Sequence, residues 1–279
     1  MEAYLIALAT VMALNVTLAL GLNLISGFCG QISLGHAAFY GVGAYTAASL
    51  SVSGVPFVLS LLAGVVIAGL FGVIIGVAAL RVREDFLAIT TMGIGFLFLG
   101  FVRKQEWLGG EFGIARIPQP MDAEGYAALA IAAAILMLLV SIHVRRSWMG
   151  EIFRAIASDE DAAKSIGINT ARYKLWAFGL GTASAGLAGG IYAHFYDIIV
   201  PDAFDFIQSI TILAMVVVGG IGSTAGAVLG AILLTLMPEL FRFINDYKLL
   251  VYGGLLIVVM RFSPGGVIGL VKLVVRRIR

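Results

Sequence analysis

Long apolar stretches without charged residues restrict most strongly how this chain can fold. A transmembrane helix needs roughly 17–25 consecutive apolar residues, and such runs recur along the whole sequence. We predict nine crossings, with eight to ten compatible with the pattern. The predicted spans are about 3–25, 34–50, 56–80, 86–101, 126–144, 175–194, 207–220, 225–241 and 249–262.

The composition agrees with a lipid environment. Hydrophobic residues make up 61% of the chain and charged residues 12%, whereas a soluble domain has about 25% charged residues. The runs lack the alternating pattern of a transmembrane β-barrel, so helices are expected. The sequence therefore predicts an all-α, polytopic membrane protein forming one transmembrane domain over residues 1–279. The net charge of +2 gives no reason to expect a nucleic-acid partner.

Basic residues between the runs predict the orientation, because cytoplasmic loops are enriched in Lys and Arg. The basic segment 145–174, the loop with Arg81 and Arg83, and the C-terminal tail are predicted to be cytoplasmic. The segments 102–125 and 195–206 are then outside, with the N-terminus outside and the C-terminus inside. The first run has no basic residues before it and is longer than a signal peptide's apolar region, so we expect a retained span.

The sequence contains no constellation that predicts catalysis. There is no H-E-x-x-H motif, no cysteine pair, no G-x-S-x-G and no nucleotide-binding G-x-x-x-x-G-K-[ST] loop. Glu239, near a helix end, is the one acidic residue inside the predicted spans, and Cys29 is interpreted as a small buried hydrophobe. We therefore predict no enzyme activity, no metal and no cofactor, with any ATP bound by another polypeptide.

A glycine-rich break follows the first run. Irregular backbone at membrane depth must be buried in protein or line an aqueous cavity, and broken helices often form substrate sites in transporters. Candidate pathway residues here are Asn23, Gln31, Ser33, His36 and Tyr40, and Ser33 is also a candidate cap of the next helix. A tight cytoplasmic turn between two spans is the alternative.

Gly27-x-x-Gly30 resembles Gly219-x-x-Gly222, which suggests an internal repeat, although frequent glycine makes chance pairing a competing explanation.

The segment 145–174 carries the strongest functional signal. Small alanines let a short helix approach another protein, a following glycine permits a sharp turn, and flanking charges fix the register with a partner. The candidate coupling residues are Glu151, Arg154, Asp161, Ala162, Ala163 and Gly167.

Several motifs together resemble a known family. The spacing Asp161-Ala162-Ala163-x-x-x-Gly167 resembles the E-A-A-x-x-x-G coupling motif of ABC importer permeases, with aspartate in place of glutamate. Stretches 23–43, 86–93, 109–118, 261–266 and 269–270 are similar, in order, to motifs of the LivM-like permeases of branched-chain amino-acid importers.

The resemblance implies a permease subunit in a bacterial inner membrane. Its expected partners are a homologous second permease, two cytoplasmic ABC ATPases and a periplasmic binding protein. The segment 150–168 would be the coupling helix, and branched-chain amino acids would be the substrate. Related permeases handle other amino acids, urea or short amides. A passive channel or an ion-coupled carrier without ATPase partners remains the alternative class of function.

Overall fold

The computed structural model describes residues 2–79, 84–240, 248–262, 265–267 and 269. Across these residues helices are the only regular secondary structure, apart from an isolated antiparallel bridge between Ile114 and Ile199. The long helices are α1 (Glu2–Leu22), α2 (His36–Val52), α3 (Phe57–Ala79), α4 (Glu84–Lys104), α5 (Ala123–Arg146), α8 (Thr170–Tyr196), α9 (Phe206–Gly219), α10 (Thr224–Leu240) and α12 (Lys248–Phe262). Shorter elements are the π-helix η1 (Asn23–Phe28), α6 (Trp148–Ser158), α7 (Glu160–Ser165), and the 3-10 turns η2 (Glu106–Leu108), η3 (Gly110–Phe112) and η4 (Pro201–Phe204).

The predicted all-helical class is confirmed for the described residues. Five helical segments are long and apolar enough to span a membrane, namely Glu2–Phe28, Phe57–Ala78, Phe86–Lys104, Ala123–Arg146 and Pro201–Gly219. Each of the other predicted spans also coincides with a helix, but these helices are shorter or less apolar. The count of nine crossings and the single domain therefore stay predictions.

Two predicted boundaries were wrong in ways that move charged residues. The helix α8 begins at Thr170 instead of 175, so Lys174 lies inside a helix and not in a loop. The helix α4 continues to Lys104 instead of ending at 101, so Arg103 and Lys104 belong to its last turn. Asn169 explains the early start of α8, because its side chain accepts a hydrogen bond from the Arg172 amide and caps the helix.

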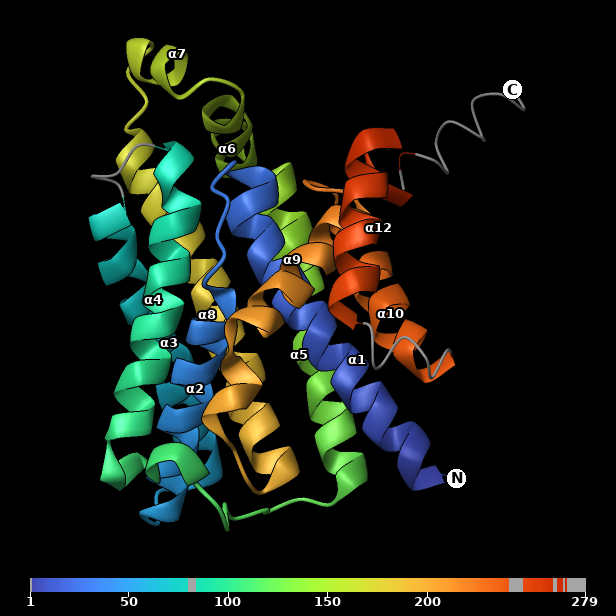
Figure 1. Ribbon diagram of the computed structural model, residues 1–279. Helices are drawn as coiled ribbons and strands as arrows, with labels where there is room; N and C mark the ends of the chain where they lie inside the picture. The colour runs from blue at the N-terminus through green and yellow to red at the C-terminus, as the bar shows by residue number, and fades with distance from the viewer. Residues whose placement is uncertain (1, 80–83, 241–247, 263–264, 268, 270–279) are drawn as a thin grey trace.

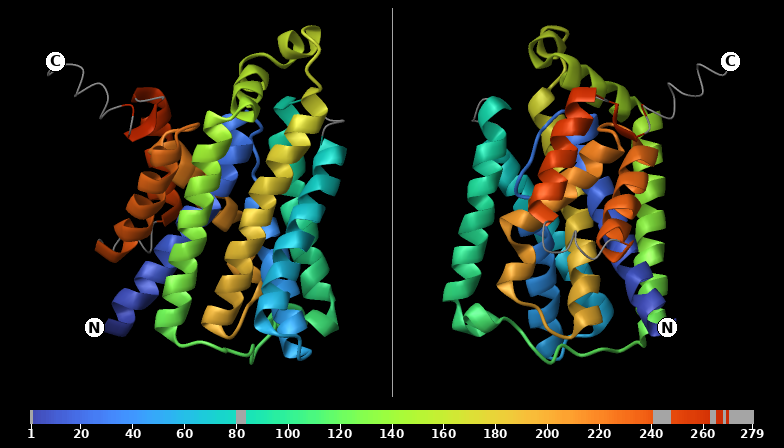
Figure 2. Two further views of the ribbon diagram at one scale, coloured as in Figure 1. Left: turned by 180° about the vertical axis from the view of Figure 1, so that it is seen from behind. Right: turned by 45° about the vertical axis from the view of Figure 1, so that its right-hand side comes forward.

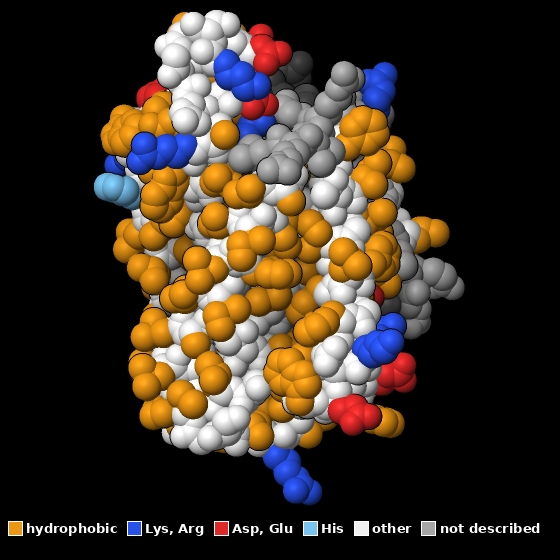
Figure 3. All heavy atoms as spheres, turned by 90° about the vertical axis from the view of Figure 1, so that its left-hand side faces the viewer, with side chains coloured by type: hydrophobic (Ala, Val, Ile, Leu, Met, Phe, Trp, Pro, Cys, Tyr) orange, Lys and Arg blue, Asp and Glu red, His pale blue; other side chains and the backbone are white. Residues whose placement is uncertain are grey.

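The helices form an upright bundle (Figure 1). The helix α1 begins at the end of the bundle opposite α6 and α7, and the connection from α4 to α5 runs along the same end as the start of α1 (Figures 1 and 2). Figure 3 shows an apolar band around the middle of one face, with most charged side chains gathered near the two ends. This distribution is typical of a helical bundle embedded in a bilayer.

The centre of the bundle is α8, which packs against α2 and α3. Small residues make this contact close: a Cβ added at Gly43 would lie 2.3 Å from the Gly186 Cα, and one added at Gly189 would lie 2.1 Å from the Tyr40 carbonyl oxygen. Lipid provides no hydrophobic drive for helices to associate, so close van der Waals packing of this kind holds them together.

Candidate functional site

The helix α1 does not end in an ordinary turn but changes into a π-helix at Asn23–Phe28. A π-helix inserts an extra residue per turn and is frequent at functional sites. Here it meets the second glycine-rich break: the Gly222 amide donates a hydrogen bond of 2.9 Å to Asn23 Oδ1. The two glycine-rich breaks thus meet at Gly27 and Gly222, although the internal repeat itself stays a prediction.

Residues 29–35 leave the π-helix as irregular backbone and return into the bundle before α2 begins (Figure 1). Several of their polar groups have partners inside the protein, whereas the buried Ser33 hydroxyl has none among the described residues. Ser26 Oγ donates to the Gln31 carbonyl at 2.9 Å, and the Leu34 amide donates to Thr91 Oγ1 at 2.9 Å. Buried irregular backbone requires such partners. The segment is thus irregular and partly buried, and its place in a substrate path stays a prediction.

The five candidate pathway residues all lie in or just after this break. Asn23, Gln31, Ser33 and His36 are buried, and Tyr40 packs its ring 5.4 Å from Tyr192 and 5.0 Å from Phe204. None of them lines either of the two grooves described below. The prediction that Ser33 caps α2 was wrong: Gly35 occupies the N-cap position and provides no side-chain hydrogen bond. Cys29 is buried, as predicted.

A polar groove of about 560 Å³ lies between α1, α9 and α10. Asn15 on α1 donates a hydrogen bond of 2.9 Å to Thr235 on α10, and the Tyr4 hydroxyl donates to the carboxylate of Glu239. Gln208 and Thr211 on α9 form the third wall. Asp202, which pairs with Arg103, and Asp205 also line the groove, and no Lys or Arg is among its described lining residues. Leu8, Val11 and Ile207 add apolar surface.

This groove was not predicted from the sequence, although a signal was present. Tyr4 and Asn15 are eleven residues apart, Gln208 and Thr211 three apart, and Thr235 and Glu239 four apart. Each spacing places the two side chains on one helix face. Single polar residues in apolar runs are easily overlooked, and their shared face becomes visible only when the three helices are placed together.

The connection between α5 and α8 forms an arm that extends from one end of the bundle (Figure 1). The helix α6 rests on the bundle through Phe153 and Ile156, which are buried, while Glu151 and Arg154 point outward and form an ion pair. The helix α7 lies beyond α6. The arm therefore has an apolar side facing the bundle and a charged side facing away from it.

Four of the six predicted coupling residues, Asp161, Ala162, Ala163 and Gly167, lie on α7 and the turn after it. Ala163 is buried, whereas the side chain of Asp161 is 94% exposed and Ile166 is 76% exposed. The Asp159 side chain caps α7 by accepting a hydrogen bond from the Ala162 amide at 2.9 Å. Glu160 and Asp161 both accept hydrogen bonds from Lys164, which raises the pKa of that ammonium group. Asp161 and Ile166 thus stand at the outer surface of the arm.

A buried ion pair fixes the arm to the bundle. Lys174, whose side chain is 6% exposed, pairs with Glu160, which also accepts a hydrogen bond of 2.9 Å from Thr170. Removing one member of a buried pair leaves an uncompensated charge, which costs several kcal/mol. The position of α7 relative to α8 is therefore held by residues that lie on both elements.

Comparison with known proteins agrees with this arrangement. The family described as "Branched-chain amino acid transport system / permease component" matches residues 4–260. The chain belongs to this permease family. It is 32% identical to the high-affinity branched-chain amino acid transport system permease protein LivM of Escherichia coli (strain K12), over 95% of this chain and 70% of the relative. No solved structure shows a significant match.

Two further relatives of the permease are similar over most of their length. The protein named LivH of Escherichia coli (strain K12) is 29% identical over 90% of each chain, and the protein named BraD of Pseudomonas aeruginosa is 26% identical over 90% of each chain. Both are named as permease proteins of high-affinity branched-chain amino acid transport systems. The expected family is thereby confirmed, and the permease is a membrane-embedded protein.

Proposed function

We propose that this chain is the transmembrane permease subunit of an ATP-driven importer and carries branched-chain amino acids across the bacterial inner membrane. The observation that carries the proposal is the exposed arm of α6 and α7, which presents Asp161, Ile166 and Gly167 away from the bundle. The chain contains no nucleotide-binding loop, so ATP is bound by two separate ATPase subunits.

In this proposal the arm docks into an ATPase. The outward charges of Glu151, Arg154 and Asp161 pair with the ATPase surface, and Ala162 allows close approach. The buried pair of Lys174 and Glu160 transmits movement of the arm to α8. The arm can shift the permease between two conformations only if its contacts differ between them. In this proposal the contacts change when the ATPase dimer closes on ATP.

The polar groove between α1, α9 and α10 forms one wall of the translocation pathway, and a second permease subunit supplies the other wall. Its chemistry matches the substrate, because the acidic groups attract an α-ammonium group and the apolar residues accept an aliphatic side chain. With the N-terminus outside, as the basic loops predict, the groove opens toward a periplasmic binding protein.

The five residues of the broken helix act one layer behind this groove. The Ala37 amide, in the first turn of α2, donates a hydrogen bond of 3.0 Å to Ser209 on α9. In this proposal Asn23, Gln31, Ser33, His36 and Tyr40 support the start of α2, and α2 in turn holds α9, which carries the groove residues Ile207, Gln208, Thr211 and Met215. Their effect on uptake kinetics is indirect in this proposal.

Replacing Thr211 with tryptophan is expected to lower uptake at least about tenfold, because the added volume fills the groove and close-packed surroundings accommodate it poorly. Thr90→Trp is a matched control. Both threonines donate a hydrogen bond of 2.9 Å to a carbonyl four residues earlier, but Thr90 lines neither groove. Uptake of radiolabelled leucine into cells with equal permease levels measures the effect. Equal uptake by the two variants would place the pathway elsewhere.

Co-purification with the ATPase subunits tests the proposed class of function. We expect the wild-type permease to retain the ATPase and Asp161→Arg to lose it, since hot-spot charges at an interface contribute about 2 kcal/mol or more. Glu111→Arg, on η3 at the opposite end of the bundle, should retain it. A folded wild-type chain that never retains an ATPase, but conducts or exchanges solute alone in vesicles, would instead be a channel or a carrier.

A further inference from the structure

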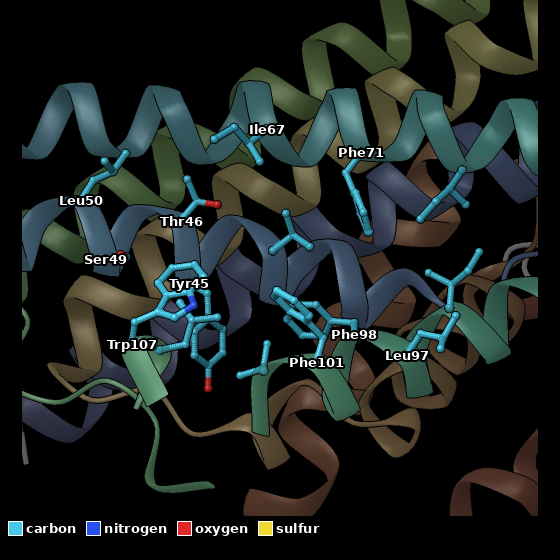
Figure 4. Close-up of a pocket in the computed structure, with 15 residues that line it drawn as sticks. Tyr45, Thr46, Ser49, Leu50, Ile67, Phe71, Leu97, Phe98, Phe101 and Trp107 are labelled. Atoms are coloured by element: carbon cyan, nitrogen blue, oxygen red, sulfur yellow. The ribbon is translucent and has the colours of Figure 1, made fainter. Parts of the chain in front are cut away.

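A second groove, of about 780 Å³, lies between α2, α3 and α4. It arises because α4 packs loosely: it scarcely touches α3, and a Cβ added at Gly93, Gly95 or Gly100 would meet nothing within 4 Å. Nearly all of its lining is apolar, and aromatic rings are prominent, including Tyr45, Phe98 and Phe101 (Figure 4). The proposed transport path does not use this groove, since it involves none of the elements α1, α9 and α10.

The length of the groove matches one half of a bilayer. On each of its three helices the lining extends over eight residue steps: Val42 to Leu50, Ile67 to Ile75 and Ile94 to Val102. At 1.5 Å per residue each stretch is about 12 Å long. One leaflet of the hydrocarbon core is about 15 Å thick, half of the usual 30 Å. The groove therefore accommodates a chain that extends through one leaflet.

One end of the groove has the chemistry of a membrane interface. Trp107 lies at this end together with Ser49 and Leu50, whereas Phe71 and Leu97 lie toward the other end (Figure 4). Exposed tryptophan is typical of the headgroup level of a bilayer, and Trp107 is 66% exposed. Lys104, also exposed, ends α4 beside it and forms no ion pair with any described residue. An ammonium group at this level attracts a lipid phosphate.

The groove opens sideways onto the membrane-facing surface. Leu97 and Phe101 on its α4 wall are each more than half exposed, and so are Leu62, Val66, Leu70 and Ile74 on the outward stripe of the neighbouring α3. A residue stripe of this kind faces lipid when a helix lies at the edge of a bundle. Phospholipid thus reaches the groove directly from the bilayer, without passing through the protein.

We propose that the groove between α2, α3 and α4 binds a glycerophospholipid from the leaflet on the side opposite α6 and α7. An acyl chain lies along Phe71, Phe98 and Phe101, and Lys104 contacts the phosphate. The bound lipid fills the space between α3 and α4. It is a structural ligand of the permease and not a transported substrate.

Lipid retained by the purified permease tests this assignment. The full-length chain is extracted from membranes in mild detergent, washed with further detergent, and analysed by native mass spectrometry for bound phospholipid. Thr46→Trp fills the groove from α2, and Leu139→Trp on α5 is the control, because Leu139 is 59% exposed and lies outside the groove. Excluding only about two methylene groups of an acyl chain already weakens binding about tenfold.

We expect wild type and Leu139→Trp to retain a phospholipid and Thr46→Trp to retain at least about tenfold less, with Lys104→Gln intermediate. If Thr46→Trp fails to fold, Leu97→Trp provides the same obstruction from the rim of the groove, where Leu97 is 73% exposed. Equal retention by all folded variants would overturn the proposal. So would efficient crosslinking of Leu97→Cys to a second permease chain, because the groove would then hold protein and not lipid.

Discussion

Replacing Gly27 with alanine is expected to destabilise the folded permease by about 3 kcal/mol or more, which is severe for a change of one methyl group. An added Cβ would lie 2.0 Å from Asn23 Oδ1 and 2.6 Å from the Gly222 nitrogen. The Asn23 side chain can rotate away only by giving up its hydrogen bond to the Gly222 amide. The clash with the Gly222 backbone remains even then.

Thermal unfolding in detergent, followed by size-exclusion chromatography with fluorescence detection, measures this effect. Gly93→Ala is the matched control, because that glycine lies within α4 and an added Cβ meets nothing within 4 Å. Alanine favours helix over glycine by about 1 kcal/mol, so the control should be as stable as wild type or more stable.

The double variant Gly27→Ala with Asn23→Ala separates the two contacts. Removing the carboxamide relieves the shorter clash but not the one with Gly222, so partial recovery of stability is expected. If Gly27→Ala melts at the wild-type temperature, the two glycine-rich breaks do not meet as closely as the structure indicates.

Replacing Gly167 with tryptophan is expected to abolish ATP-driven uptake while the permease stays folded in the membrane. Gly167 ends α7 with φ +87°, and its amide donates to the Lys164 carbonyl at 2.9 Å while the Ile168 amide donates to the Ala163 carbonyl at 3.1 Å. This pair of hydrogen bonds is a Schellman motif, in which glycine is favoured because an L side chain costs about 1–2 kcal/mol there. No atom lies within 4 Å of an added Cβ, so the tryptophan points into open space.

Open space in the isolated chain becomes contact surface if the arm docks into an ATPase. A bulky residue at such an interface costs about 2 kcal/mol or more, which corresponds to about 30-fold weaker docking. ATPase activity of the reconstituted importer should then no longer respond to substrate. This prediction depends on the proposed ATPase partner.

Gly167→Asn is the control, because asparagine tolerates the left-handed backbone conformation and adds little volume. It should keep most of the uptake. If tryptophan and asparagine reduce uptake equally, backbone strain in the turn is responsible and not obstruction of docking. Normal uptake by Gly167→Trp, at a normal level of the permease, would remove α7 from the coupling element.

The sequence alone determined that the chain is helical and where most helices lie. In lipid an apolar run without charges is stable as a helix. The predicted and observed helix bounds therefore differ by only a few residues for most runs. The short helix of the proposed coupling segment could also be located, since Asp161, Ala162, Ala163 and Gly167 lie within it and the turn after it. The spacing of neighbouring residues is enough to predict a short helix and the turn that follows it.

The tertiary structure alone decided how the two glycine-rich breaks meet and which polar residues share a groove. Asn23 and Gly222 are 199 residues apart, and no local pattern predicts that a π-helix turns the Asn23 side chain toward that amide. Asn15 and Thr235 are likewise each ordinary members of an apolar run until α1 and α10 pack together. Helix periodicity shows which residues share a face, but only packing shows which faces meet, because close contact in lipid depends on the shape of both partners.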